Sequence, residues 1–314
     1  MKKWAPVLIM IAAILWSVDG LLRRKLYSIP TPMLVMIEHL VGVLFLLPLW
    51  PKFWQEYKRM KMRDWAVICT TALIGGVLGT MFYTAALAKV NYIQYSVVIL
   101  LQKTQPLFAV ALAAIILKEK LTKLYLFLAI LGLTAAYVIS FPNLVPNVQG
   151  HSAEIVAAGL ALGAAFCWGS ATVLGKLVLH RLNFGAATTI RFLLVIPIAF
   201  AIAWGSDQTI ALSQITTEQW QYFIGIALTS GAMACLIYYK GLQHTPAKIS
   251  TFAEMMFPVS AVLIGFSFLD EKLLWQQWIA AFVLLGVILF LSLYSNDEKK
   301  FVPSSQQISD QEQN

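Results

Sequence analysis

Charged residues are scarce in this chain, and their scarcity limits the class of protein it can be. Asp, Glu, Lys and Arg make up 12% of the 314 residues, whereas hydrophobic residues make up 59%. A soluble domain carries about 25% charged residues, because its surface has to be solvated. So few charges cannot cover a water-exposed surface, and the mean hydropathy of +0.74 agrees with this. The composition therefore predicts an integral membrane protein.

Cysteine is also rare, and the short motifs of common enzymes are missing. Cys69, Cys167 and Cys235 all lie in apolar stretches, and their spacing fits neither a disulfide framework nor a metal site. The sequence has no Walker A loop, no dinucleotide fingerprint, no His-Glu-x-x-His and no Gly-x-Ser-x-Gly. We therefore expect no cofactor, no metal and no enzymatic or ATP-driven chemistry.

Long apolar runs are what the chain contains instead. A membrane-spanning helix needs about 20 mostly apolar residues. Ten segments meet this length within a few residues, which predicts an all-α polytopic fold with short loops. The segments are 4–22, 33–50, 64–86, 94–117, 122–140, 155–178, 184–204, 219–240, 247–269 and 274–294.

An internal duplication divides these segments into two sets of five. Four pairs of residues share one offset of 152 positions, which indicates a repeat. Because five is odd, the second copy enters the membrane from the opposite side, as in the inverted repeats of secondary transporters. We expect a first repeat over 4–140, a second over 155–294 and a disordered cytoplasmic tail over 295–314. The pairs are Trp16 and Trp168, His39 and Arg191, Pro106 and Pro258, and Glu119-Lys120 and Glu271-Lys272.

The distribution of Lys and Arg predicts the orientation. With both termini in the cytoplasm, most of these residues fall on cytoplasmic segments, and the cluster Arg23-Arg24-Lys25 is the main exception. The net charge of +8 is explained in this way, so nucleic acid is not an expected partner. The lipid bilayer is the expected surroundings of the chain.

Polar residues near the centres of two apolar segments are the first candidates for chemistry. Lys103 lies in the fourth segment, near Gln102 and Gln105, at a depth close to the centre of the bilayer. A charge at that depth usually faces a cavity or a partner. Glu254, in the ninth segment, is the natural partner of Lys103. The pair either contacts a substrate or forms a structural ion pair, and the sequence leaves both alternatives open.

Proline follows these polar residues in both segments. Pro106 and Pro258 each remove a backbone donor, so we expect a kink in each helix. Two kinked helices with polar groups at the kink indicate opposite walls of one site. The alternative is that the prolines only shape helix packing.

The second and seventh segments carry further ionisable groups. Arg191 is a permanent cation suited to a carboxylate or phosphate, and its repeat equivalent His39 titrates near neutral pH. Glu38 is adjacent to His39, and Asp19 lies four residues before Arg23 in the first segment. Structural pairing is the alternative for each. Glu254, Glu38, His39 and Asp19 are the proton-coupling candidates.

Aromatic residues occupy matching places in the two repeats. Trp16 and Trp168 lie in the first helix of each repeat. Tyr83 and Tyr238 lie in comparable places in the third helix, although a gap of three residues is needed to align them. Aromatic walls with a polar tip suit an organic solute. A packing or membrane-interface role is the alternative for each of them.

The arrangement of these residues resembles the EamA family of the drug/metabolite transporter superfamily. The resemblance rests on ten helices in two halves and on the repeated tryptophan, proline and Glu-Lys pairs above. It implies a carrier of the bacterial inner membrane, often an exporter of amino acids or related metabolites. It also implies a central cavity, and the carried-over lining candidates are Trp16, Tyr83, Gln102, Lys103, Trp168, Tyr238 and Glu254.

These observations predict a secondary transporter that works by alternating access and is not an enzyme. The expected substrate is a small polar or zwitterionic metabolite, such as an amino acid or a related anionic compound, and the expected direction is export. One alternative is an exporter of hydrophobic cations or drugs. Another is a membrane scaffold or accessory subunit that transports nothing. Protons are a candidate second partner, and a homodimer is compatible with the sequence.

Overall fold

The computed structural model of the protein describes residues 4–88, 101–102, 104–140, 152–260, 263 and 274–301. The described residues are mostly helical and contain no strand. The prediction of an all-α fold is therefore confirmed.

The helices of the first half follow the expected spans. In the third span, a seven-residue π-helix joins α5 to α6. Among the described residues, the fourth span is represented chiefly by α8, because residues 89–100 and 103 lie outside them. The elements are α1 (Ala5–Ser17), α2 (Asp19–Arg23), η2 (Arg24–Leu26), α3 (Thr31–Leu46), η3 (Leu47–Leu49), α4 (Trp50–Lys58), α5 (Met62–Thr71), the π-helix η4 (Ala72–Leu78), α6 (Gly79–Leu87), α8 (Gln105–Ile116) and α9 (Lys123–Ser140).

The second half shows the same order with longer individual helices. The eighth span is divided between α12 and α13, and the ninth is described from α14 to residue 260 and at residue 263. The elements are α10 (Ser152–Leu179), α11 (Phe184–Gly205), η5 (Leu212–Gln214), α12 (Thr217–Leu228), α13 (Ala232–His244), α14 (Ala247–Ala253) and α16 (Trp275–Phe301).

The last helix corrects one expected boundary. We expected the tail to begin at residue 295, but α16 continues to Phe301. The charged stretch that extends it, Asp297 to Lys300, contains residues that a helix tolerates once it leaves the membrane. The rest of the expected tail, 302–314, and most of the segment between the two expected repeats, 141–151, lie outside the described residues.

Local sequence signals account for several helix starts. Pro6 and Pro32 lie in the first turns of α1 and α3, where a missing backbone donor costs nothing. Asn183 caps α11 by accepting a hydrogen bond from the backbone of Gly185. Thr216 caps α12 in the same way, through the backbone N–H of Gln219.

Five helical stretches in the described chain are long and apolar enough to cross a membrane, with four shorter apolar helices beside them. Among the expected spans, only the ninth contains none of these helices. The long stretches are Thr31–Lys58, Met62–Leu87, Ile155–Leu179, Phe184–Gly205 and Thr217–His244. The shorter ones are Ala5–Ser17, Gln105–Ile116, Lys123–Val138 and Trp275–Leu291.

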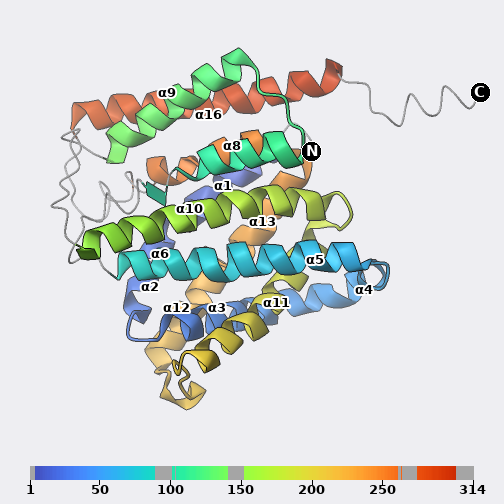
Figure 1. Ribbon diagram of the computed structural model, residues 1–314, viewed down its shortest axis with the longest axis vertical. Coiled ribbons are helices and arrows are strands. Elements are labelled where there is room, and N and C mark those ends of the chain that lie inside the picture. The colour runs from blue at the N-terminus through green and yellow to red at the C-terminus, as the bar shows by residue number, and fades with distance from the viewer. Residues whose placement is uncertain are drawn as a thin grey trace, which may run out of the picture.

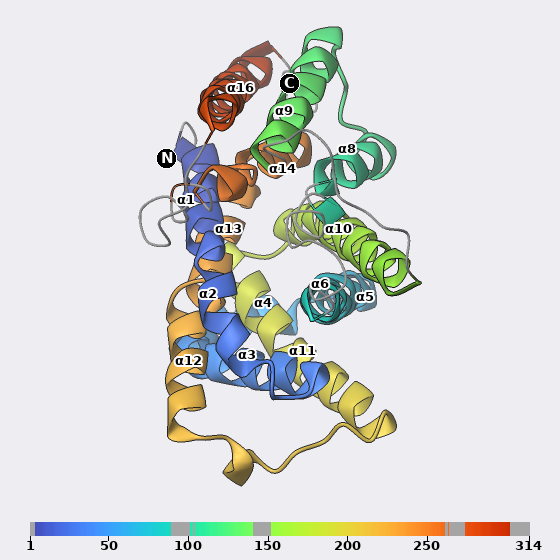
Figure 2. The same cartoon turned by 90° about the vertical axis from the view of Figure 1, so that its left-hand side faces the viewer.

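The two halves are intertwined by exchanged helix contacts. The first helix of each half packs against the third of the other, so α1 lies against α13 and α10 against α6. Figures 1 and 2 show the pair α9 and α16 at one end of the molecule and the pair α3 and α11 toward the other. A two-fold relation between the halves produces this pattern, and it leaves the middle of the molecule enclosed by helices of both.

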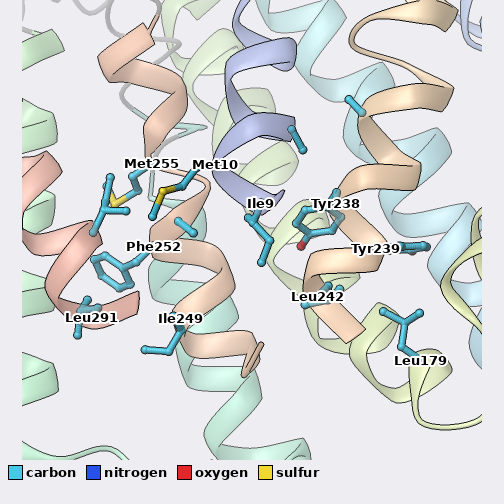
Figure 3. Packing of buried hydrophobic residues seen from close by; sticks show 14 of the residues in the cluster. Ile9, Met10, Leu179, Tyr238, Tyr239, Leu242, Ile249, Phe252, Met255 and Leu291 are labelled. Carbon is cyan, nitrogen blue, oxygen red and sulfur yellow. The ribbon is translucent and has the colours of Figure 1, made fainter. Parts of the chain in front are cut away.

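The largest hydrophobic cluster fills the space beside that centre. Figure 3 shows Ile9 and Met10 of α1 between α14, which carries Phe252, and α13, which carries Tyr238. Ile9 and Phe252 are fully buried. This packing fixes the position of the polar residues that follow on the same helices.

A charged residue of the first half holds the start of α14. The Glu119 carboxylate accepts hydrogen bonds from the backbone N–H groups of Ala247 at 2.7 Å and Lys248 at 3.0 Å. The Tyr125 hydroxyl donates to the Lys248 carbonyl at 3.1 Å. A carboxylate at a helix N-terminus satisfies free backbone donors and the helix dipole together. The Glu-Lys motif that ends the fourth span therefore anchors the ninth, whereas Glu271-Lys272 lies outside the described residues.

Candidate functional site

A cavity of about 210 Å³ lies between the two halves. Its border is formed by α1, α2, α3, α6, α8, α10, α11, α13 and the π-helix, together with residues that connect helical segments. It brings together eleven of the residues singled out in the sequence. The polar ones are Asp19, Glu38, His39, Gln102, Gln105, Arg191 and Glu254, and the aromatic ones are Trp16, Tyr83, Trp168 and Tyr238.

Three predicted residues do not belong to this border. Lys103 lies outside the described residues, so its two alternative roles both stay predictions. Pro106 is in the first turn of α8, and Pro258 is in the helical stretch 256–260 that follows a turn at 254–255. Each proline thus follows an interruption of its helix, a position where its missing N–H is tolerated.

Helix interruptions place polar groups at the cavity. Val18 separates α1 from α2, and Asp19 is the first residue of α2. Residues 229–231 separate α12 from α13, and Ser230 lies within that break. Glu254 follows the last residue of α14. Broken helices are tolerated in a membrane where they line a cavity, and in carriers they often form the binding site.

Glu254 is the centre of a hydrogen-bond network that joins four spans. Its carboxylate accepts from Tyr238 Oη at 2.8 Å and from Gln105 Nε2 at 2.7 Å. Gln105 Oε1 in turn accepts from Gln102 Nε2 at 3.2 Å. The hydroxyl of Thr172 lies 3.0 Å from Tyr238 Oη. Several donors converge on one carboxylate, so the network orients the oxygens of Glu254.

Aromatic rings form two pairs across the halves. Trp16 and Tyr238 have ring centroids 5.1 Å apart, and Tyr83 and Trp168 have centroids 5.2 Å apart. Each pair joins the first helix of one half to the third helix of the other. The four rings border the cavity and give it two matching aromatic faces.

Arg191 borders the cavity beside a second tyrosine of α13. Its Nη1 donates to Tyr239 Oη at 3.3 Å, and its guanidinium carbon lies 5.5 Å from the Tyr239 ring centroid. Among the described residues no carboxylate forms a salt bridge with Arg191, and its buried Nε has no hydrogen-bond partner there. Figure 3 shows Tyr238 and Tyr239 leaving α13 on different sides. Neighbouring tyrosines therefore hold Glu254 and Arg191.

His39, the repeat equivalent of Arg191, is packed into the same border. Its ring centroid lies 4.6 Å from that of Phe192, and its Nδ1 is 2.9 Å from the carbonyl oxygen of Val35. The imidazole is 5% exposed, so an added proton there has little access to water. The structure thus places this proton-coupling candidate at the cavity with one ring nitrogen already engaged.

Two carboxylates share one arginine on another part of the border. Arg23 Nε donates to Asp19 Oδ2 at 2.6 Å, and Arg23 Nη2 donates to Glu38 Oε2 at 2.9 Å. Ser230, from the other half, donates to Asp19 Oδ1 at 2.7 Å. Arg23 is 4% exposed, and its Nη1 has no hydrogen-bond partner among the described residues. These four residues are called the acidic cluster below.

Sequence reasoning missed part of this cluster. The i,i+4 spacing predicts the pair of Asp19 with Arg23, but the expected first span ends at residue 22 and leaves Arg23 in the loop that follows. Ser230 and Thr172 carried no signal, because single hydroxyl residues in apolar segments are common. The break of the eighth span at 229–231, which brings Ser230 to the cavity, has only its small residues, Ser230 and Gly231, as a sequence cue.

The π-helix explains how Trp168 is held. Trp168 Nε1 donates to the carbonyl of Gly75 at 3.1 Å. A π-helix shifts backbone carbonyls out of the regular α pattern, and such bulges are frequent at functional sites. Gly75 and Gly76 also border the cavity. A Cβ on Gly75 would lie 2.4 Å from Ala171 Cβ, so this glycine allows α10 to approach.

No group of three or more His, Cys, Asp or Glu side chains in the described ranges could hold a metal ion. Flat aromatic faces, hydrogen-bond donors and acceptors and both signs of charge meet in one enclosed space. Such a site binds an organic solute.

A polytopic membrane protein with a polar cavity between two interlocked halves has the form of a small-molecule transporter. A family model described as the EamA-like transporter family matches residues 3–141 and again residues 155–293. The chain belongs to this family, and it is a multi-pass membrane transporter of small molecules.

Similar proteins agree with that assignment. The riboflavin transporter ImpX of Fusobacterium nucleatum is 36% identical over 262 residues, which cover 83% of this chain and 88% of that protein. The uncharacterized transporter YwfM of Bacillus subtilis is 23% identical, covering 89% and 91%. A solved crystal structure of a protein superposes with a TM-score of 0.74 at 16% identity, covering 95% of this chain and 99% of that one. That last likeness concerns the fold alone.

Proposed function

We propose that the protein is a secondary transporter of riboflavin, which it moves by alternating access through the central cavity. The observation that carries the proposal is the pair of aromatic faces, Trp16 with Tyr238 and Tyr83 with Trp168, around a polar centre. Riboflavin combines a flat heteroaromatic ring with an uncharged hydroxylated chain. The 36% identity to a riboflavin transporter supports the same substrate.

The polar groups suit this solute better than a free amino acid. A flavin ring offers carbonyl oxygens and an imide N–H, which call for a donor and an acceptor close together. Arg191 and Glu254 supply these through adjacent tyrosines of α13. An amino acid would use the same two groups, but most amino acids have no flat ring system to stack against the four aromatic side chains. A small polar or zwitterionic metabolite of that kind is therefore a competitor to be tested.

The exchanged packing of the halves supports alternating access. Glu254 of the second half is bonded to Gln105 of the first, and Asp19 of the first half is bonded to Ser230 of the second. A rocking motion of the halves has to break and remake such contacts, and a solute in the cavity competes for them. We propose Glu254 as the group that couples a proton to this exchange, because its carboxylate lies between the halves.

Orientation and direction complete the proposal. We propose that the protein lies in a bacterial inner membrane with both termini facing the cytoplasm. The exposed residues Lys52, Lys58, Arg59 and Lys61, in α4 and just after it, support this orientation. Export, which the family resemblance implies, stays a prediction. Labelling of a cysteine introduced at Lys58 with a membrane-impermeant reagent tests the orientation, since intact cells should protect it.

The transport experiment uses the full chain in proteoliposomes. Vesicles loaded with unlabelled riboflavin should accumulate labelled riboflavin by counterflow, and empty vesicles or vesicles without protein should not. Imposing a pH gradient of either sign then tests proton coupling and direction. Competition by amino acids would favour the zwitterion alternative, and competition by tetraphenylphosphonium would favour an exporter of hydrophobic cations. Absence of all flux would contradict the proposal and favour a scaffold.

A further inference from the structure

The charges around the cavity are unevenly divided between its two ends. Tyr57 Oη donates to the Ala186 carbonyl at 3.3 Å, so the start of α11 lies beside the end of α4. The α3–α4 stretch and α11 therefore run in opposite directions. Glu38 is about two turns from the start of α3, and Arg191 is about two turns from the start of α11. The two residues thus reach the cavity from opposite membrane faces.

The acidic cluster defines the end that includes Glu38. Its single guanidinium, on Arg23, is bonded to two carboxylates, so with both carboxylates ionised these four residues carry an excess of one negative charge. The side chains of Arg23 and Glu38 are only 5% and 8% exposed. Water screens such buried charges weakly, so a further anion at this end meets a strong repulsion. An uncharged hydroxyl, by contrast, can donate to a carboxylate or accept from Arg23 Nη1, which has no partner among the described residues.

The other end of the cavity carries a positive charge, on Arg191. Arg191 has no salt-bridge partner among the described residues, and its Nε is buried without a hydrogen bond there. The Tyr239 hydroxyl accepts a hydrogen bond from Nη1 of this guanidinium. A guanidinium in this state favours an electron-rich group such as a ring carbonyl. Glu254, held by the adjacent tyrosine, offers an acceptor to a neighbouring N–H.

We propose that the flavin binds in the cavity in a single orientation. Its carbonyl-imide edge contacts Arg191 and Glu254, and its hydroxylated chain contacts the acidic cluster. This inference rests on the proposed function. It also adds a specificity: the site accepts riboflavin and rejects its 5′-phosphate, FMN. A phosphate monoester brings a charge of about −1.5 to −2, and in this direction it would lie against Asp19 and Glu38.

The test compares three flavins on the purified full-length protein by quenching of flavin fluorescence. Lumiflavin has a methyl group in place of the hydroxylated chain, and FMN carries the phosphate. We expect FMN to bind at least about tenfold more weakly than riboflavin. A tenfold change in the dissociation constant corresponds to about 1.4 kcal/mol, and the repulsion between two buried like charges is at least that large. Glu38→Gln keeps an oxygen for Arg23 but removes one charge. It should narrow the ratio between riboflavin and FMN by about tenfold.

Two further variants test separately the contacts to the hydroxylated chain and to the ring of the flavin. Ser230→Ala frees Asp19 from its bond to the second half, and it should weaken riboflavin more than lumiflavin. Arg191→Gln should weaken both by the same factor. Ser170→Ala is the matched control, because the Ser170 hydroxyl bonds only within its own helix, to Phe166, and does not border the cavity. It should leave all three affinities unchanged.

Each outcome decides between the two proposals. Tight riboflavin binding with equally tight FMN binding, or a Glu38→Gln effect shared by both, would overturn the direction of binding and leave riboflavin as the substrate. If neither flavin binds, riboflavin transport is wrong, and uridine and uridine 5′-monophosphate replace the pair. Preference for the neutral nucleoside, reduced in Glu38→Gln, would then support the acidic cluster as the filter against anions. Equal binding or none would overturn both proposals.

Discussion

The indole of Trp16 and the phenol of Tyr238 lie 5.1 Å apart, although one residue belongs to the first half of the chain and the other to the second. Tyr83 and Trp168 repeat this relationship with the halves exchanged, at 5.2 Å. The repeat equivalence of the tryptophans is thus visible as two aromatic faces of one cavity. A flat solute between them would contact both halves of the protein at once.

Removing one of these rings should weaken flavin binding. An aromatic pair is worth about 0.5–1.5 kcal/mol beyond the area it buries, so Trp16→Ala should raise the dissociation constant by at least about threefold to tenfold. Trp16→Phe should keep most of the affinity. Trp204→Ala is the control, because Trp204 is 70% exposed on the outside of the helix bundle. A fluorescence titration in which Trp16→Ala matched this control would contradict the role of the aromatic faces.

The ionisable carboxylate of Glu254 should be needed for proton-coupled uptake of riboflavin but not for riboflavin counterflow. Glu254→Gln keeps an oxygen to accept from Tyr238 and Gln105, but it cannot release a proton in the neutral pH range. We expect riboflavin counterflow to persist in this variant while accumulation driven by a pH gradient is lost. The comparison variant is Tyr238→Phe, which removes one donor to the carboxylate and leaves its charge. Gradient-driven uptake that survives in Glu254→Gln would assign coupling to another residue.

The carboxylate of Glu119 should stabilise the fold by capping α14. Glu119→Ala leaves two backbone donors, on Ala247 and Lys248, without their partner, and the loss of such a cap costs about 0.5–2 kcal/mol. Glu119→Gln retains one accepting oxygen and should cost less. Thermal unfolding of the purified protein measures both. Equal melting temperatures for wild type and Glu119→Ala would show that the cap contributes little.

Close helix packing at the π-helix should make one glycine irreplaceable. A Cβ on Gly76 would lie 2.4 Å from Val195 Cγ2, which forces α11 or the π-helix to move. Such overpacking costs about 1–3 kcal/mol, so Gly76→Ala should lower the melting temperature. Gly159→Ala provides the control, because nothing lies within 4 Å of its added Cβ. There the higher helix propensity of alanine should leave stability unchanged or slightly raised.

Much of the fold was predictable because apolar length and internal repetition are strong signals. A helix marks each of the ten expected spans in the described chain, and the EamA-like family model matches both halves. The interruptions at Val18 and at residues 229–231 were not predictable. A break in a transmembrane helix depends on the polar groups that neighbouring helices offer to it, and a single sequence does not give these neighbours.

The sequence predicted most residues of the candidate site, but it did not predict which of them contact one another. The sequence singled out Glu254 and Arg191, yet it paired Glu254 with Lys103, which lies outside the described residues. The structure instead joins Glu254 to Gln105 and Tyr238. The expected first span ends at residue 22, so the sequence does not predict that Arg23 is buried. Its burial between two carboxylates comes from the way α2 packs against α12, a contact between distant parts of the chain.

Protection of Cys235 by riboflavin tests most directly whether the solute occupies this cavity. Cys235 borders the cavity, whereas Cys69 and Cys167 do not. Replacing those two by serine leaves a single native thiol, whose labelling by a small methanethiosulfonate reagent can be followed in time. We predict that riboflavin slows the labelling with a concentration dependence equal to that of its transport. Labelling that proceeds at the same rate with saturating riboflavin would contradict binding in the cavity.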